Sequence, residues 1–473
     1  MKKPNILICM CDQLRAAETG CYGNEVIRTP NVDALASEGV RFVHGITNSP
    51  VCMAARSVLV SGQHNRTCTG GIANAVSDGQ LPEYPITGRP HIKDESLAEC
   101  LRDAGYRTAA IGKWHIHSWP KDVGFEYSLI PRVHHCHAGQ NYSENGGPEF
   151  VPEGFSVDFE AGRAAEFLQR QAKGEEPFFL LYNISPPHCP VADAPEKYLK
   201  MYDPQSIPLR PNVDVAMELR DQNGWGNNDL WFKIYRWDYK YYMFHLPYTD
   251  KLPERYGLRE LIAEYYGATT WMDEAFGRVL KALEDAGVKD DTIVIFVSDH
   301  GDSLGSHGLA QKMNPMEESI NIPCIIRWPG KIEKGVDSTT VAGLVDVMPT
   351  MLGLAGVPVP AAVQGKDLSG LLTGKTAAEG ENCAFVEIAM NSISVRTPTH
   401  MCQVEFEGTP RKLKEFATRF HNLAKDPYEM ANLAGTGTER EVEEELIEKI
   451  RAFDRRTPFL RDTPAGEGGL NRR

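Results

Sequence analysis

The stretch NILICMCDQ, residues 5–13, decides the fold, because an apolar run leads directly into an acid and an amide. The run NILICM predicts a short buried strand of the kind that parallel sheets contain. Further apolar runs follow amphipathic helical patterns, at residues 40–43, 108–111, 177–184 and 292–298. This alternation predicts an α/β fold, a large and mostly parallel sheet flanked by helices on both faces.

The pattern changes after residue 365. The segments AFVEIAM, SISVRT and MCQVEFE alternate with period two and predict antiparallel strands, and residues 439–456 predict a closing amphipathic helix. We therefore divide the chain into a large catalytic domain over residues 1–365 and a smaller C-terminal α+β subdomain with an antiparallel sheet over residues 366–473. Within the first, residues 221–255 form an aromatic-rich insertion that holds three of the seven tryptophans.

Polar side chains stand where the predicted strands end. Asp12 and Gln13 follow the first strand, and Asp299 and His300 follow the strand at 292–298. In open α/β sheets, ligands bind beyond the carboxyl ends of the strands. Two carboxylates, an amide oxygen and an imidazole would hold one divalent cation, and this oxygen-rich set favours Ca²⁺, Mg²⁺ or Mn²⁺ over Zn²⁺. The alternative is that Asp12 and Asp299 only cap the elements that follow them.

A second group of residues near strand ends and adjoining loops is basic. If these side chains converge, they form a pocket for a tetrahedral anion and stabilise charge on its oxygens. Taken alone, each lysine also fits a solvated surface group, and His188 fits an ordinary loop residue. The group consists of Arg56, Lys113, His115, His188 and Lys312.

Cys52 lies in SPVCMAARSVLVSGQ, residues 49–63, at the start of a predicted helix. The helix dipole and the free N–H groups of a first turn favour an anion there, so an activated thiolate is one interpretation. A buried inert thiol is the other.

Composition argues against several functions. The 473 residues carry a formal net charge of −14, which argues against a nucleic acid or an anionic membrane as partner. The N-terminal apolar run is too short for a signal peptide, and no segment reaches membrane-spanning length. Eleven cysteines without Cys-x-x-Cys pairs predict free thiols in a reducing cytoplasm, although a chain trimmed of its signal peptide would look the same.

The pentapeptide CMAAR, residues 52–56, resembles the Cys-x-Pro/Ala-x-Arg signature of the sulfatase family. Further segments are similar to the family's other motifs, in the same order along nearly the whole chain. They are PNILICMCDQLR, GCYGN, TPNVDALASEGVRF, GYRTAAIGKWH, PPHCP, SDHGDSLGSHG, INIPCIIRWPG and NLAKDPYEMANLAG. The resemblance implies an alkaline-phosphatase-like fold and a sulfuric ester hydrolase whose cysteine a maturase oxidises to formylglycine.

The resemblance also implies a nucleophile and a metal site. The hydrated aldehyde made from Cys52 attacks sulfur, and its second hydroxyl lets the sulfated intermediate collapse. Asp12, Gln13, Asp299 and His300 hold one divalent metal ion together with the modified residue.

The basic residues receive roles by the same resemblance. Arg56 orients the hydrated aldehyde, and Lys113 and Lys312 bind the sulfate oxygens. His115 assists breakdown of the intermediate, and His188 stands near the leaving oxygen as donor or acid.

Three positions depart from the commonest family pattern. Gln13 and His300 stand where many sulfatases have Asp and Asn, and both resemble the choline-sulfatase and phosphonate-monoester-hydrolase branches. We therefore expect Ca²⁺ first, with Mg²⁺ or Mn²⁺ as alternatives. Ala54 stands where proline is usual, which resembles substrates of a radical-type maturase and favours an anaerobic bacterial host.

Three hypotheses follow for function. The first is hydrolysis of a sulfate monoester, on a sulfated carbohydrate. The second is hydrolysis of a phosphonate monoester or phosphodiester at the same site. The third is a non-catalytic oxyanion-binding protein in which Cys52 stays a thiol. Residues 221–255 either rim the pocket and stack on a sugar ring or fill a core or an oligomer interface, so a homo-oligomer stays open.

Overall fold

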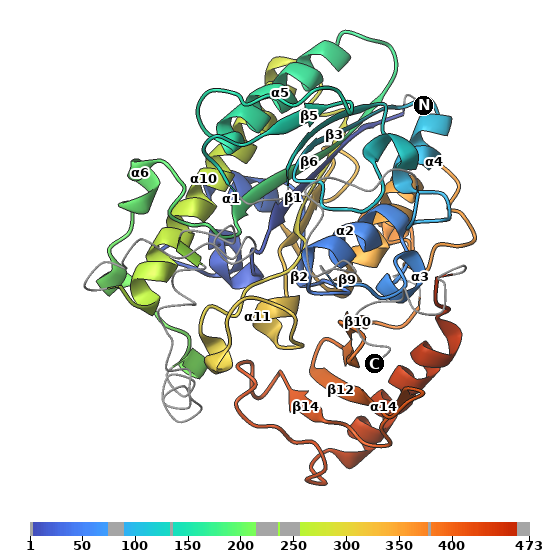
Figure 1. The fold of residues 1–473 in the computed structure, drawn as a ribbon. Helices are drawn as coiled ribbons and strands as arrows, with labels where there is room; N and C mark the ends of the chain where they lie inside the picture. Colours follow the sequence, from blue (N-terminus) through green and yellow to red (C-terminus); the bar gives the residue numbers. More distant parts are fainter. Residues whose placement is uncertain are drawn as a thin grey trace.

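A computed structural model describes residues 3–73, 89–132, 136–213, 235–236, 256–376 and 380–460. Its main feature is a nine-stranded sheet in the order β5-β4-β3-β6-β1-β7-β8-β2-β9 (Figure 1). The strands are β1 Asn5–Asp12, β2 Val40–Ile46, β3 Arg107–Gly112, β4 Tyr127–Pro131, β5 Tyr142–Glu144, β6 Phe178–Pro187, β7 Thr292–Ser298, β8 Cys324–Arg327 and β9 Val336–Gly343.

Most neighbouring strands in this sheet run parallel, which confirms the predicted fold class. β1 lies in the middle and pairs in parallel with both β6 and β7. Of the described strands in this sheet, only β5 and β8 run antiparallel to their neighbours. The apolar pattern of the sequence does not mark β4, β5 or β9: β5 has three residues, and the first half of β9 is polar and partly exposed at the sheet edge.

Helices cover both faces of the sheet, as the apolar strands predict. Side chains of β1 alternate between two cores, because successive residues of a strand point to opposite faces. Leu7 and Cys9 pack with α1, α5 and α10, whereas Ile6 and Ile8 pack with α2, α4 and α12. The helices are α1 Pro30–Ser37, α2 Cys52–Ser61, α3 Asn65–Cys68, α4 Leu97–Asp103, α5 Ser156–Gln171, α6 Glu196–Leu199, α10 Leu258–Asp285, α11 Glu317–Ile320, α12 Val347–Ala355, α13 Ser369–Leu372 and α14 Arg440–Arg456.

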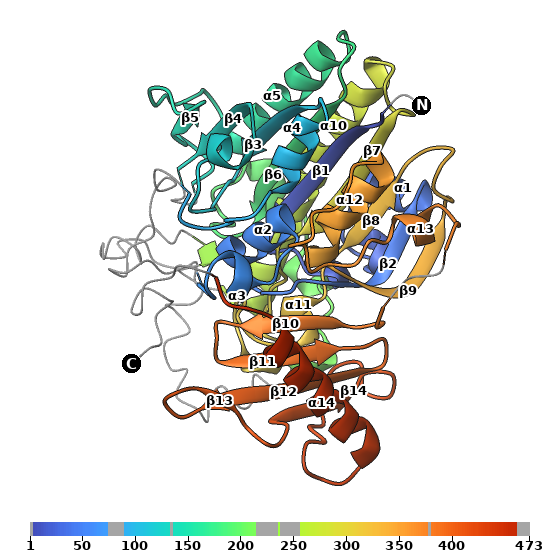
Figure 2. The ribbon, with the colours of Figure 1, turned by 90° about the vertical axis from the view of Figure 1, so that its right-hand side faces the viewer.

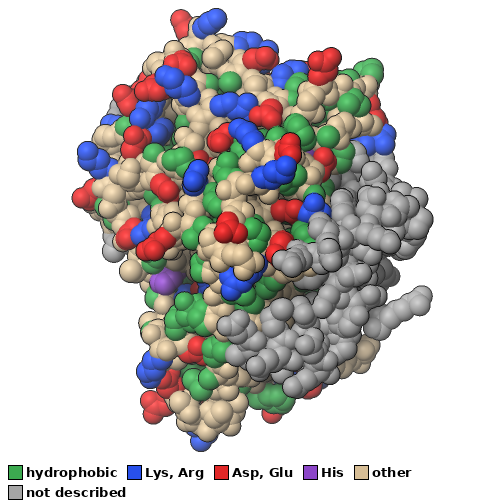
Figure 3. Space-filling model, turned by 90° about the vertical axis from the view of Figure 1, so that its left-hand side faces the viewer, with side chains coloured by type: hydrophobic (Ala, Val, Ile, Leu, Met, Phe, Trp, Pro, Cys, Tyr) green, Lys and Arg blue, Asp and Glu red, His purple; other side chains and the backbone are tan. Residues whose placement is uncertain are grey.

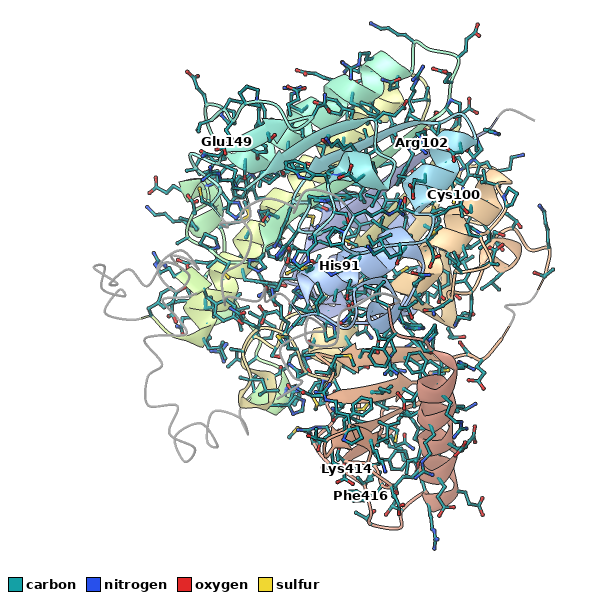
Figure 4. All side chains as sticks on the ribbon, turned by 45° about the vertical axis from the view of Figure 1, so that its right-hand side comes forward. His91, Cys100, Arg102, Glu149, Lys414 and Phe416 are labelled. Carbon is teal, nitrogen blue, oxygen red and sulfur yellow. The ribbon has the colours of Figure 1, made fainter. Side chains whose placement is uncertain are left out.

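A smaller antiparallel sheet lies at one end of the molecule, with α14 against it (Figure 2). Its strands are β10 Ala384–Ile388, β11 Ser392–Arg396, β12 His400–Glu407, β13 Lys412–Leu413 and β14 Arg419–Asn422. Lys414 and Phe416 mark the end of this sheet that is remote from the large one (Figure 4).

Both faces of the small sheet are covered. Phe385 of β10 packs in the core that α14 completes, whereas Val386 and Ile388 pack against Ile46 and Val341 of the large domain. Leu368 and Leu372 pack in the core of the large sheet, so the first residues of the predicted C-terminal subdomain contact the larger one. The boundary at residue 365 stays a prediction.

The aromatic-rich insertion lies mostly outside the described residues, and so do its tryptophans, Trp231 and Trp237 among them. Within it the structure describes Tyr235 and Arg236 alone, whose backbone carbonyls accept hydrogen bonds from Val191 and Ala192 at 2.8 and 3.1 Å. No helix in the described part of the chain is both long enough and apolar enough to cross a membrane. On the face shown in Figure 3, basic and acidic side chains are interspersed over the large domain.

Candidate active site

The predicted metal ligands come together at the carboxyl ends of two neighbouring strands. Cys11 of β1 lies opposite Ser298 of β7, so the acids that follow these residues, Asp12 and Asp299, are neighbours. The backbone N–H of Asp299 donates to the carbonyl of Cys11 at 3.2 Å, which continues the pairing beyond the strand. The parallel register therefore places two buried carboxylates side by side.

Cys52 is the first residue of α2 and is fully buried. Its Sγ lies 3.1 Å from His300 Nε2 and 3.7 Å from Asp12 Oδ1. Lys312 Nζ reaches the same sulfur at 3.2 Å and Lys113 Nζ at 3.9 Å. Burial raises the pKa of the thiol, but Lys113, Lys312 and His300 outweigh it and hold the pKa well below its usual value.

These residues form one compact group of candidate ligands. One ligand atom from each of Asp12, Cys52, Asp299 and His300 lies within 4.8 Å of the others, and all four residues are buried. Hard carboxylate oxygens with one imidazole suit Ca²⁺, Mg²⁺ or Mn²⁺. The donor set therefore fits the predicted cation, with a residue at position 52 completing it.

The carboxylates of Asp12 and Asp299 are buried and lie near positively charged side chains. Burial, then Cys52, raises the pKa of Asp12, but Lys113, His188 and Arg56 together lower it below its usual value. Burial and the neighbouring charge of Asp12 raise the pKa of Asp299. A divalent cation between these acids would offset both their desolvation and their mutual repulsion.

Lys113 and His115 follow β3, and a glycine at the end of this strand allows the turn that brings them to the site. Gly112 has φ +90°, and a Cβ on it would clash with the carbonyl oxygen of Asn183 on β6. The chain turns there so that Lys113 Nζ forms a buried ion pair with Asp12 Oδ2. Burial lowers the pKa of His115, which favours a neutral ring beside the thiol.

His188 and Lys312 reach the site from the loops after β6 and β7. Nζ of Lys312 lies 3.0 Å from Nε2 of His188, and Nδ1 of His188 lies 2.6 Å from the carbonyl oxygen of Cys189. Because a carbonyl only accepts, the ring proton sits on Nδ1 and Nε2 accepts from Lys312. Burial, then Lys312, lowers the pKa of His188 to about 3, in agreement with a neutral imidazole.

Gln13 takes part through its side-chain oxygen. Oε1 accepts from Nζ of Lys312 at 2.8 Å, and Nε2 donates to Oδ2 of Asp302. All ten predicted positions, from Asp12 to Lys312, thus belong to one connected set of side chains.

Sequence reasoning missed Asp302, Tyr235 and Tyr265, which contact Gln13 or its partner. Tyr265 lies in the first third of α10 and donates from its hydroxyl to the backbone carbonyl of Gln13 at 2.6 Å. Nothing in a helical pattern marks this tyrosine. Asp302 stands three residues after Asp299 in SDHGDSLGSHG, and that spacing was a usable signal.

Comparison with known proteins identifies the family of this chain. The family model described as Sulfatase matches residues 4–357, and the model described as N-sulphoglucosamine sulphohydrolase, C-terminal, matches residues 305–456. An ulvan-active sulfatase of Formosa agariphila is 30% identical over 460 residues, covering 95% of this chain and 80% of that relative. An N-acetylglucosamine-6-O-sulfatase of Bacteroides thetaiotaomicron is 27% identical, covering 95% of this chain and 86% of that relative.

Solved structures share the fold over nearly the whole chain. A protein in complex with its substrate D-glucosamine-2-N,6-O-disulfate matches with a TM-score of 0.77 and 25% identity, over 96% of this chain and 98% of that one. The phosphonate monoester hydrolase of Agrobacterium radiobacter matches with a TM-score of 0.71 and 21% identity, over 96% of each chain.

Proposed function

We propose that this chain, which belongs to the sulfatase family and is a sulfuric ester hydrolase, cleaves sulfate monoesters of carbohydrates with an oxidised Cys52 and a divalent cation. The observation that carries the proposal is the convergence on one buried sulfur. His300 Nε2 and Lys312 Nζ lie 3.1 and 3.2 Å from it, and Asp12 Oδ1 lies 3.7 Å away.

Two groups would complete the site. Formylglycine at position 52, when hydrated, would supply one hydroxyl for attack on sulfur and another for release of sulfate. The cation would favour ionisation of the attacking hydroxyl and neutralise charge on the ester oxygens.

The chain's own residues hold these groups in place. Arg56 binds both Asp12 and Asp299 through their Oδ2 atoms, at 3.0 and 2.9 Å, which leaves the Oδ1 atoms to face Cys52 and His300. Lys113 and Lys312 point at the position of the nucleophile and would donate to the sulfate oxygens.

Lys312 and His188 would protonate the leaving oxygen. Their nitrogens lie 3.0 Å apart and hold a proton between them. The leaving alkoxide of a sugar is a strong base, so a donor at this place lowers the barrier to its departure.

The carbohydrate substrate is supported by the relatives. One is described as active on ulvan, one on N-acetylglucosamine-6-O-sulfate, and a solved structure holds D-glucosamine-2-N,6-O-disulfate. The same fold also occurs in phosphonate monoester hydrolases, and Gln13 and His300 favour that activity as a second candidate.

The test uses protein coexpressed with a formylglycine-generating maturase. Mass mapping of residues 49–63 should find position 52 about 18 Da lighter than cysteine, or its hydrate. We expect sulfate release from members of a panel of sulfated mono- and disaccharides, and none from Cys52→Ala. Verified aldehyde without release from any sulfate ester, aryl sulfates included, would contradict the proposal.

A parallel assay separates the two candidate activities. The same preparation is given 4-nitrophenyl sulfate and an aryl phosphonate monoester, and kcat/KM is compared. A larger kcat/KM for the sulfate supports the first candidate, and a larger value for the phosphonate supports the second.

A further inference from the structure

Asp302 contacts the side-chain amide of Gln13 and is completely buried. Its Oδ2 accepts from Nε2 of Gln13. Its Oδ1 accepts from the hydroxyl of Tyr235 at 2.7 Å and from the backbone N–H of Leu304 at 2.8 Å. The carboxylate is therefore held from three sides, and one of them is the aromatic-rich insertion.

The backbone of Gln13 is fixed as well. Its φ is +65°, a left-handed conformation that is rare for residues other than glycine. Its N–H donates to Oδ1 of Asp299 at 3.1 Å, and its carbonyl accepts from Tyr265 at 2.6 Å. With the backbone held, the contacts of the side chain depend on the orientation of its terminal amide, because rotation of the amide exchanges its oxygen and nitrogen.

That rotation decides what Gln13 offers to the site. An amide has a donor end and an acceptor end, whereas an ionised carboxylate only accepts. With Nε2 toward Asp302, Oε1 faces Nζ of Lys312 at 2.8 Å. The reversed amide would set its oxygen against the carboxylate of Asp302 and its NH₂ against the ammonium group of Lys312.

We propose that Asp302, anchored by Tyr235, is a positioning residue that fixes the amide of Gln13 so that its oxygen faces the cation site. The inference rests on the proposed function, because it requires a cation beside Gln13. It also gives Tyr235 a role distinct from stacking on substrate: this residue of the insertion supports the metal site from outside.

An exchange of the two side chains tests this role. Asp302→Asn turns an NH₂ group toward Gln13, because the N–H of Leu304 keeps the new amide oxygen at the Oδ1 position, and the variant therefore favours the reversed amide of Gln13. We expect its affinity for Ca²⁺ or Mn²⁺ to fall by about 10- to 100-fold. Combining it with Gln13→Glu rebuilds the hydrogen bond in reverse, from the new amide at position 302 to the new carboxylate at position 13, and keeps the net charge. We expect the double variant to bind within about threefold of wild type. Two independent effects would give this result only if Gln13→Glu alone raised the affinity by the factor that Asp302→Asn loses.

The measurement is isothermal titration of Ca²⁺ and of Mn²⁺ into metal-free protein expressed without the maturase. The measured affinity therefore depends neither on the aldehyde nor on turnover. Gln13→Glu alone completes the cycle, and Tyr235→Phe, which removes only the hydroxyl, should lower affinity by about fivefold. Glu149→Gln is the matched control, since this exposed acid pairs with Arg132, the residue after β4 near the edge of the large sheet. Thermal midpoints in EDTA report whether each variant is folded.

The outcomes are distinct. Wild-type affinity in Asp302→Asn, or a double variant as weak as Asp302→Asn, would overturn the inference and leave the proposed function standing. A wild-type protein that binds neither cation would contradict the metal site itself, and this inference with it. Loss in Asp302→Asn with recovery in the double variant supports it when Gln13→Glu alone gains no affinity, and a gain in Gln13→Glu equal to that loss would overturn it.

Discussion

Arg56 donates from Nη2 to Oδ2 of Asp12 at 3.0 Å, in a pair whose side chains are 2% and 0% exposed. The same guanidinium reaches Asp299 at 2.9 Å and the backbone carbonyl of Lys113 at 2.8 Å. One planar cation thus ties together the ends of β1, β7 and β3, and α2 carries both this cation and Cys52. Cys52 is thus held in one unit with the three strand ends that Arg56 joins.

The first prediction concerns this guanidinium. Arg56→Lys keeps the charge but cannot reach three acceptors at once, so we expect kcat/KM for a sulfate ester to fall by at least about 100-fold. The measurement is steady-state kinetics on aldehyde-verified protein. Arg102→Lys, an exposed change on α4, is the control and should leave kcat/KM unchanged (Figure 4).

Lys312 carries the second prediction. Lys312→Met preserves much of the side chain's volume but removes the donor to Cys52, Gln13 and His188. We expect kcat to fall by about 10²- to 10³-fold, as for loss of one donor to transition-state charge. Lys414→Met, at the remote end of the small sheet, should behave as wild type. Equal kcat values for the two variants would rule out this role for Lys312.

The third prediction concerns the join between the two sheets. Arg66 of α3 and Glu387 of β10 form an ion pair in which both side chains are 1% exposed. Glu387→Gln removes the buried counter-charge of Arg66 and leaves this guanidinium paired with Asp454 alone, at 2.6 Å, so we expect the free energy of unfolding to fall by about 1–3 kcal/mol. Urea denaturation measures this free energy of unfolding. Glu176→Gln removes the exposed partner of Arg107 and should not shift the transition measurably.

Glu160 gives a prediction about pH. Burial raises the pKa of this α5 carboxyl to about 8, although the hydroxyl of Tyr142 donates to it. Between the ordinary pKa of 4.5 and about 8 the folded protein keeps a proton that the unfolded chain has lost, so Glu160 makes stability fall as pH rises through this window. Above about pH 8 its contribution no longer changes.

The variant Glu160→Gln removes this proton linkage. We expect its unfolding free energy to vary less between pH 5 and 8 than that of wild type, by up to about 1.4 kcal/mol for each pH unit. Urea titrations at four pH values test this. If wild type and variant keep a constant difference in stability across the window, the assignment of the proton to Glu160 is wrong.

The last prediction belongs to the aromatic-rich insertion. Trp231→Ala or Trp237→Ala should impair turnover of a sulfated sugar far more than that of a small aryl sulfate, if these rings stack on the sugar. The ratio of kcat/KM for the two substrates is the measurement. Equal losses for both would remove these tryptophans from substrate recognition.

Much of the site followed from strand ends. Asp12 and Asp299 close two apolar runs, and in parallel strands the ends of neighbours meet at one edge, so their proximity was predictable without knowing the register. The small sheet was predicted too, from residues that alternate with period two along its strands. The structure gives a different reason for this alternation. Phe385 and Val386 face two different cores, rather than a core and solvent.

Other contacts could not be predicted, because they join residues far apart in the chain with no periodic pattern. Tyr235 and Asp302 meet across 67 positions, and Arg66 and Glu387 across 321. Each pair is specified by the way loops cross, which hydrophobic periodicity does not encode.

Two features of this protein were determined by the sequence alone, through the order of its apolar strands and amphipathic helices. They are a mostly parallel sheet covered by helices and the edge of that sheet at which the polar residues lie. Tertiary structure alone decided which nitrogen or oxygen of each side chain faces the sulfur of Cys52. The physical reason is that burial of apolar surface is non-directional and can be read from composition along the chain, whereas hydrogen bonds are directional and depend on where every partner lies.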